Sequence, residues 1–104
     1  MTRLAAVGFC NDSGVGRELV SAVRQLPISG IFLLENPQKP TRLDLLQTSA
    51  YMVSRRGSTR DMDMFLDRQK PDVILTWEGP GRPEFPRLWR SKGIRWVNVV
   101  HIDW

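Results

Sequence analysis

Apolar residues gather in short stretches of the chain that predict four strands, at residues 4–10, 30–34, 73–77 and 94–100. The first two stretches are unbroken by polar residues, which is typical of a strand covered on both faces, as in a parallel sheet. The third is short and apolar as well. The pattern therefore indicates a sheet that is buried between other elements.

Helical periodicity predicts four helices between and around these strands. In residues 17–26 the apolar side chains form one stripe, Asp12 or Ser13 is available to cap the start, and Pro27 ends the helix. The second helix has one apolar face, made of Leu43, Leu46, Ala50 and Val53. We expect this helix to end at Gly57.

The remaining two helices have clearer ends. Residues 58–69 open with Ser58 as a cap and an early acid, and they place Met62, Phe65 and Leu66 on the apolar side. Residues 83–92 are stopped by Gly93, and their inward side chains are Phe85, Leu88 and Trp89.

Strands that alternate with helices favour an α/β protein. We expect a Rossmann-like, open, mostly parallel sheet of about four strands with flanking helices. At 104 residues the chain is expected to form a single domain over residues 1–104. The opening strand–helix–strand unit is expected to be parallel and right-handed.

The charge balance favours anionic partners. The chain has 15 Lys and Arg against 11 Asp and Glu, a net charge of +4, which attracts phosphate groups and nucleic acid weakly. The basic residues are dispersed, with loose clusters at residues 55–60 and 82–95, so a solvated basic face is the simpler interpretation. Nucleic acid is a disfavoured partner on this evidence, but it stays an alternative.

Cysteine and histidine usage limits the chemistry and the compartment. Cys10 is the only cysteine and His101 the only histidine, so neither an internal disulfide nor a zinc site of Cys and His ligands is expected. No metal or cofactor is predicted. The sequence shows no signal peptide and no stretch of about 20 apolar residues. We therefore expect a cytoplasmic protein without a transmembrane segment.

Three segments are expected to meet at the carboxyl ends of the strands, where open α/β sheets bind ligands. They are residues 11–17, 78–82 and 101–104. In the first, Gly14 and Gly16 permit close approach of a ligand, and Arg17 adds a charge at the start of a helix. The segment matches neither a Walker A motif nor the dinucleotide fingerprint. An ordinary strand-to-helix turn is therefore an equal alternative.

Two further residues have a functional and a structural interpretation. His101 lies at a strand end, where it can act as a general base or as a hydrogen-bond donor; otherwise it is a satisfied, partly buried histidine. Glu78 is either a base or ligand residue, or a solvated loop acid. Cys10 is expected to be a small buried residue rather than a nucleophile.

In combination, these segments resemble the N-terminal half of retaining, nucleotide-sugar-dependent glycosyltransferases of GT-B fold. The resemblance rests on Asp12-Ser13-Gly14-Val15-Gly16-Arg17-Glu18-Leu19, Lys70-Pro71-Asp72-Val73-Ile74-Leu75 and Val97-Asn98-Val99-Val100-His101-Ile102-Asp103. The chain departs from the family pattern at Ser13, which replaces the first glycine, and at Ile102, which separates His101 from the acid.

The resemblance implies roles for particular residues. Gly14 and Gly16 would lie near the phosphates of the donor, Arg17 would begin the first helix, and His101 would face the reacting sugar as the catalytic residue. Ser13, Glu78 and Asp103 complete the set of substrate- or donor-binding residues expected at this edge. The donor would be a nucleotide-sugar, and no metal is implied.

The resemblance also implies an incomplete enzyme. GT-B enzymes bind most of the sugar nucleotide with a second domain, and without it neither donor orientation nor water exclusion is secured. We therefore expect an acceptor-side domain that is inactive alone, a truncated unit whose missing wall comes from a complementary C-terminal domain or a homodimer. The alternative is a non-catalytic α/β module that binds phosphate-bearing ligands, nucleic acid or a protein partner.

Overall fold

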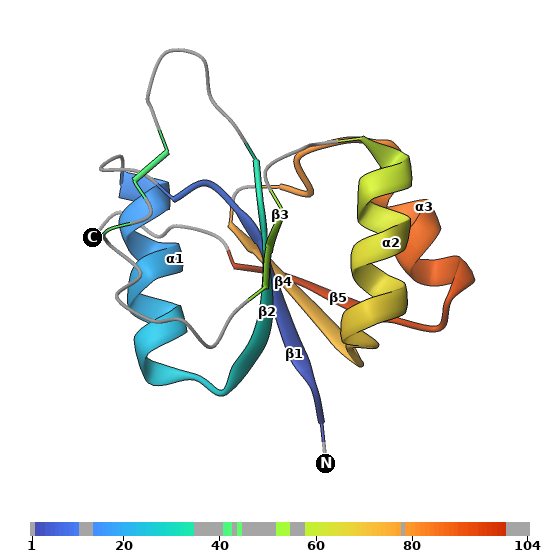
Figure 1. The fold of residues 1–104 in the computed structure, drawn as a ribbon, viewed down its shortest axis with the longest axis horizontal. Coiled ribbons are helices and arrows are strands. Elements are labelled where there is room, and N and C mark those ends of the chain that lie inside the picture. Colours follow the sequence, from blue (N-terminus) through green and yellow to red (C-terminus); the bar gives the residue numbers. More distant parts are fainter. Residues whose placement is uncertain are drawn as a thin grey trace.

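A computed structural model describes residues 2–10, 14–34, 41–42, 44, 52–54, 58–77 and 79–99 (Figure 1). Strands and helices alternate along most of the chain. The elements are β1 (Leu4–Gly8), α1 (Gly14–Gln25), β2 (Ile28–Leu33), β3 (Met52–Ser54), α2 (Thr59–Gln69), β4 (Val73–Trp77), α3 (Glu84–Ser91) and β5 (Arg95–Val99).

The strands form one five-stranded sheet in the order β3-β2-β1-β4-β5, and every neighbouring pair is parallel. Helix α1 covers one face of the sheet, and α2 and α3 cover the other (Figure 1). The prediction of an open Rossmann-like α/β sheet is therefore confirmed, with one strand more than expected.

The additional strand is β3, and it corrects the helix predicted through Val53. β3 pairs with β2, with Ile31 opposite Val53 and Phe32 opposite Ser54. A strand of three residues at a sheet edge has no apolar run of its own, so its conformation depends on hydrogen bonds to β2. The other positions of that predicted helix, Leu43, Leu46, Ala50 and Gly57, lie outside the described residues.

The ends of α2 follow the predicted capping residues. Asp61 N donates to Ser58 Oγ at 3.1 Å, so the serine satisfies an amide of the first turn. Lys70 closes the helix in the left-handed region, with φ of 45°, and its amide donates to Leu66 O. Gly93 follows α3 with φ of 72°, as its predicted role as a helix stop requires.

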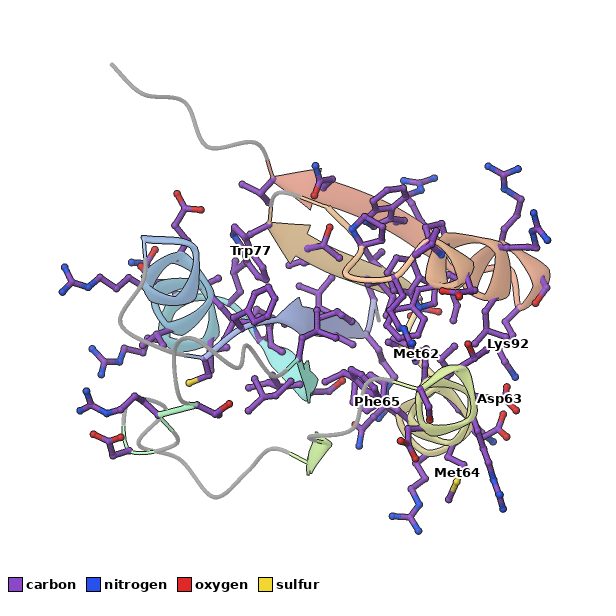
Figure 2. All side chains as sticks on the ribbon, turned by 90° about the horizontal axis from the view of Figure 1, so that it is seen from above. Met62, Asp63, Met64, Phe65, Trp77 and Lys92 are labelled. Carbon is purple, nitrogen blue, oxygen red and sulfur yellow. The ribbon has the colours of Figure 1, made fainter. Side chains whose placement is uncertain are left out.

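Two clusters of buried side chains hold the helices to the sheet. The aromatic cluster, on the side of α2 and α3, consists of Ala5, Val7, Phe32, Leu34, Met62, Phe65, Leu66, Ile74, Phe85 and Trp89. The α1 cluster, on the opposite side, consists of Ala6, Cys10, Leu19, Val20, Val23, Ile28, Ile31, Leu33 and Trp77. Figure 2 shows this division: Met62 and Phe65 project from α2, and Trp77 lies on the side of α1.

A pair of exposed ion pairs ties the end of α3 to α2. Lys92 Nζ lies 2.9 Å from Asp63 Oδ1 and 3.2 Å from Asp67 Oδ1 (Figure 2). The hydrogen bond to Asp63, and then the one to Asp67, raises the pKa of Lys92. One member of the second basic cluster is thus balanced by local carboxylates.

Candidate functional site

The topology of the sheet singles out one edge for ligand binding. β1 and β4 are neighbours, but β1 continues into α1 on one face and β4 continues into α3 on the other. Ligands of open α/β sheets bind at the carboxyl ends of the two strands where the connections diverge in this way. We call residues 8–10, 14–17 and 79–82, which surround this point, the switch-point edge.

Gly8 allows the end of β1 to be covered closely. A Cβ atom at this position would lie 3.0 Å from Leu19 Cδ1 and 3.7 Å from Trp77 Cε3. The Gly8 carbonyl accepts a hydrogen bond from Leu34 N at 2.9 Å, which ties β1 to the residue after β2. The absence of a side chain therefore brings α1 and Trp77 together over the strand end.

Cys10 is buried at the same edge and is held by two hydrogen bonds. Its Sγ donates to Arg42 O at 3.0 Å, and its carbonyl accepts from Arg42 N at 2.7 Å. Burial, and then the charge of Asp44, raises the pKa of the thiol, while Arg42 opposes this. Cys10 is completely buried, so the interpretation of it as a small buried residue is confirmed.

Arg42 brings a charge to this edge that is already paired. Its guanidinium donates from Nε to Asp44 Oδ1 at 3.0 Å and from Nη2 to Asp44 Oδ2 at 2.8 Å. The hydrogen bond from Arg42 lowers the pKa of Asp44. Both side chains are exposed, so the pair adds a fixed dipole rather than net charge.

The start of α1 contains the glycines that the sequence placed in a loop. Gly14 and Gly16 belong to the first turn of the helix, so the prediction that the helix begins at Arg17 is wrong by three residues. Gly16 is buried and Arg17 is exposed. The helix thus places Gly16 inside the molecule and its first charged side chain, Arg17, in solvent.

The loop after β4 folds back toward the end of β2. Gly79 and Gly81 have φ of 125° and 86°, values that side chains other than glycine rarely adopt. A Cβ on Gly81 would collide with Leu34 Cδ1. Gly81 therefore allows the loop to lie directly on Leu34 of the aromatic cluster, and Gly79 allows the turn that precedes it.

A polar network fixes the beginning of this loop. Trp96 Nε1 donates to Thr76 Oγ1 at 2.8 Å, and Thr76 Oγ1 donates to Asn98 Oδ1 at 2.8 Å. Asn98 Oδ1 also accepts from Gly79 N at 2.8 Å. The amide of Asn98 thus anchors the loop to the end of β5, next to the switch-point edge.

Comparison of the chain with protein-family models, with curated proteins and with solved structures gave no match. The family resemblance therefore remains a hypothesis. The geometry of the switch-point edge is the basis on which a function can be assigned.

The structure brings together two of the three predicted segments. Residues 14–17 follow β1 and residues 79–82 follow β4, so both lie at the carboxyl ends of adjacent parallel strands. The remaining predicted site residues, Ser13, Glu78, His101 and Asp103, lie outside the described residues. Their roles stay predictions.

Neither a metal cluster nor a membrane-spanning helix occurs in the part of the chain that the structure describes. Within those ranges, no His, Cys, Asp and Glu side chains form a group of three that could hold a metal ion. None of the described helices has both the length and the apolar character needed to cross a membrane.

The sequence interpretation missed Thr76 and Asn98. Both are polar residues inside apolar strands, and Thr76 is completely buried. A buried polar side chain requires a partner, so Thr76 carried a usable signal, whereas Asn98 is exposed on β5. The pairing itself was hidden, because it depends on the register that places Thr76 opposite Asn98.

Proposed function

We propose that the switch-point edge binds a phosphate-bearing ligand, with the phosphate held at the N-terminus of α1. The observation that carries the proposal is the position of α1, whose first turn follows β1 at the point where the connections of the sheet diverge. A helix N-terminus presents backbone N–H groups and the positive end of the helix dipole to an anion. The site is therefore suited to a phosphate group.

The composition of the first turn supports an anionic ligand. The helix opens with Gly14-Val15-Gly16-Arg17, and this turn has no acidic residue. The exposed Arg17 adds a full positive charge, and the net charge of +4 acts in the same direction.

The other side of the proposed site comes from the loop after β4. Gly79 is held by Asn98 Oδ1, and within the described part of the chain no hydrogen bond engages Asn98 Nδ2. Asn98 is exposed, so its side-chain amide N–H is available to a hydroxyl or carbonyl group of the same ligand. A phosphate attached to a sugar or nucleoside would match donors on both sides.

A glycosyltransferase-like acceptor-side domain is the second candidate, in which the phosphate belongs to a nucleotide-sugar. It is favoured by Gly14 and Gly16 in the first turn after β1, the positions that the family resemblance assigns to the donor phosphates. In this candidate His101 is the catalytic residue, with Ser13, Glu78 and Asp103 near the substrates. Activity then requires a complementary donor-binding domain.

Amide chemical shifts in an NMR titration test the proposal. Inorganic phosphate, UDP and UDP-glucose are expected to shift the amides of Gly14, Gly16 and Arg17. Arg17→Gln is expected to weaken binding about five-fold, the effect of about 1 kcal/mol for an exposed charge. Arg24→Gln, at the opposite end of the same helix, is the matched control and leaves the affinity unchanged.

The pattern of shifts separates the candidates. Additional shifts at Gly79 and Asn98 with UDP-glucose, beyond those with UDP, support the nucleotide-sugar candidate. A response only to short oligonucleotides, centred on Arg60 or on residues 87–95, would contradict both. Equal weakening by Arg17→Gln and Arg24→Gln would show that general charge, rather than the start of α1, attracts the ligand.

A further inference from the structure

β5 forms one outer edge of the sheet. It pairs with β4 on one side, and no other described strand pairs with it (Figure 2). All five of its residues are exposed, and its large apolar side chains Trp96, Val97 and Val99 are 38%, 40% and 39% exposed. An edge strand of this kind offers a row of unpaired backbone N–H and C=O groups to another strand.

One face of β5 has no helix over it in the described structure. Val97 lies opposite Leu75, which packs against the α1 cluster, so Val97 and Val99 belong to the α1 face. Helix α1 contacts β1 and β4, and in Figure 2 it lies beside the middle of the sheet rather than beside β5. Exposed valines thus adjoin the unpaired backbone edge.

The opposite face of β5 is covered. Trp96 lies 5.8 Å from Trp89 of α3, measured between ring centroids, and its indole N–H is bonded to Thr76. These contacts hold β5 in place against β4 and α3. The strand therefore presents a fixed edge and one fixed apolar face, which favours pairing without rearrangement.

We propose that β5 pairs antiparallel with β5 of a second copy of this chain, around a two-fold axis at Val97, and that the two five-stranded sheets become one continuous sheet. The proposal stands apart from the ligand site. Antiparallel pairing points the carboxyl ends of the two sheets in opposite directions, so each switch-point edge remains built from one chain.

The sequence of β5 suits this register. Val97 lies opposite the partner's Val97, and Trp96 lies opposite the partner's Asn98. The single charge of the strand, Arg95, lies four residues from its symmetry mate along the pair, about 14 Å away. At physiological ionic strength this exceeds the Debye length of about 8 Å, so the two charges do not oppose association.

The pairing of Arg95 with Val99 of the second copy also favours this register. In this register the alkyl stem of Arg95 runs beside the partner's Val99, and an arginine can bury that stem while its guanidinium stays in water. A C2 interface requires a patch that complements itself. β5 meets that requirement with apolar residues at its centre and its charge at one end.

Cysteine cross-linking tests the register. Val97→Cys places two thiols directly opposite, within the Cα separation that a disulfide needs, whereas Val99→Cys leaves them about 14 Å apart. Under mild oxidation, with diamide as the oxidant, Val97→Cys is expected to form a disulfide-linked dimer and Val99→Cys is not. Cys10 is buried and serves as the internal control for unfolding. Equal cross-linking of both variants, or of neither, would overturn the proposed register.

Light scattering after size exclusion tests the association itself. The unmodified chain is expected to elute as a dimer, and Val97→Lys, which brings two ammonium groups together at the axis, as a monomer. Met64→Lys alters an apolar side chain on α2 that is 48% exposed, somewhat more than Val97, and is expected to stay dimeric. A monomeric unmodified chain, or loss of the dimer in both lysine variants, contradicts the proposal. If Val97→Lys unfolds, the comparison of Val97→Cys with Val99→Cys still tests whether the dimer forms through β5.

Discussion

The two faces of the sheet are built differently. On the α2 and α3 side, aromatic rings interlock: Phe32 makes edge-to-face contacts with Phe65 at 5.5 Å and with Phe85 at 5.8 Å. On the α1 side, branched aliphatic side chains from a single helix pack on β1 and β2. Among the described elements, α2 and α3 cover the first face and α1 covers the second.

This asymmetry determines which parts of the sheet are covered by helices and which are accessible. The helices α2 and α3 and the aromatic cluster cover the sheet from β2 to β5 on one side, whereas on the other side no described helix lies over β5. The start of α1 also lies at the switch-point edge. The start of α1 and the exposed valines of β5 therefore both lie on the α1 side, whereas the loop after β4 approaches the ligand site from the side of the aromatic cluster.

Truncation of one residue on each face is the strongest test of this asymmetry. Phe32 and Leu33 are neighbours on β2, both fully buried and on opposite faces. Phe32→Ala is expected to lower the free energy of unfolding by about 3–5 kcal/mol. Leu33→Ala is expected near the lower end of the range for leucine, about 2 kcal/mol, because α1 can move into the cavity without displacing a second described helix. Urea denaturation measures both, and a larger loss for Leu33→Ala would refute the difference in rigidity.

Replacing glycine by alanine tests the same difference between the two faces by adding volume instead of removing it. Gly81→Ala combines a left-handed backbone with a collision at Leu34 of the aromatic cluster, and a loss of about 2–4 kcal/mol is expected. Gly8→Ala meets the flexible end of Leu19 at 3.0 Å and Trp77 at an ordinary contact distance of 3.7 Å, both on the α1 side, and a change within about 1 kcal/mol is expected. Thermal unfolding gives both values. Equal losses of stability would mean that the packing on the α1 side adjusts to an added methyl group no better than the packing on the other side.

The polar network on the closed face is expected to matter less than its packing. Thr76→Val keeps the shape but removes the hydroxyl that joins Trp96 and Asn98, for an expected loss of about 1–3 kcal/mol. Thr76→Ser, the control, keeps the hydroxyl. Hydrogen exchange at Gly79 N should rise in the valine variant alone, since its acceptor Asn98 loses its orientation. Unchanged exchange at Gly79 would show that the loop is anchored by other contacts.

The smallest effect is expected at Trp89, in the centre of the aromatic cluster. Its Nε1 is buried and has no hydrogen-bond partner among the described residues, which costs about 1–3 kcal/mol. Trp89→Phe removes that cost but leaves a small cavity, so the free energy of unfolding should change by less than about 1 kcal/mol. A loss above about 3 kcal/mol in urea denaturation would mean that the indole N–H has a partner.

Much of the fold could be predicted because its signals are local. The buried strands β1, β2 and β4 are apolar runs, and the helices α2 and α3 carry their own end signals and apolar stripes. β3 was missed because only its pairing with β2 makes it a strand. The first turn of α1 was placed in a loop because two glycines in a short segment are also typical of a turn.

The candidate site was less predictable for a related reason. The carboxyl edge followed from the parallel order of strands, which is a general rule. The anchoring of Gly79 by Asn98 joins residues 19 positions apart, and Arg42 reaches Cys10 across 32 positions. Contacts at such separations are set by the register of the sheet and by loop paths, which no local pattern encodes.

The three described tryptophans give the molecule built-in optical probes. Trp77 lies at the end of β4 beside Gly8, Trp89 is fully buried, and Trp96 is partly exposed on β5. Indole emission moves to shorter wavelength as the ring leaves water. Ligand binding is therefore expected to change the fluorescence of Trp77, unfolding that of Trp89, and pairing with a second strand that of Trp96. Variants that keep one tryptophan at a time could follow each event without a label.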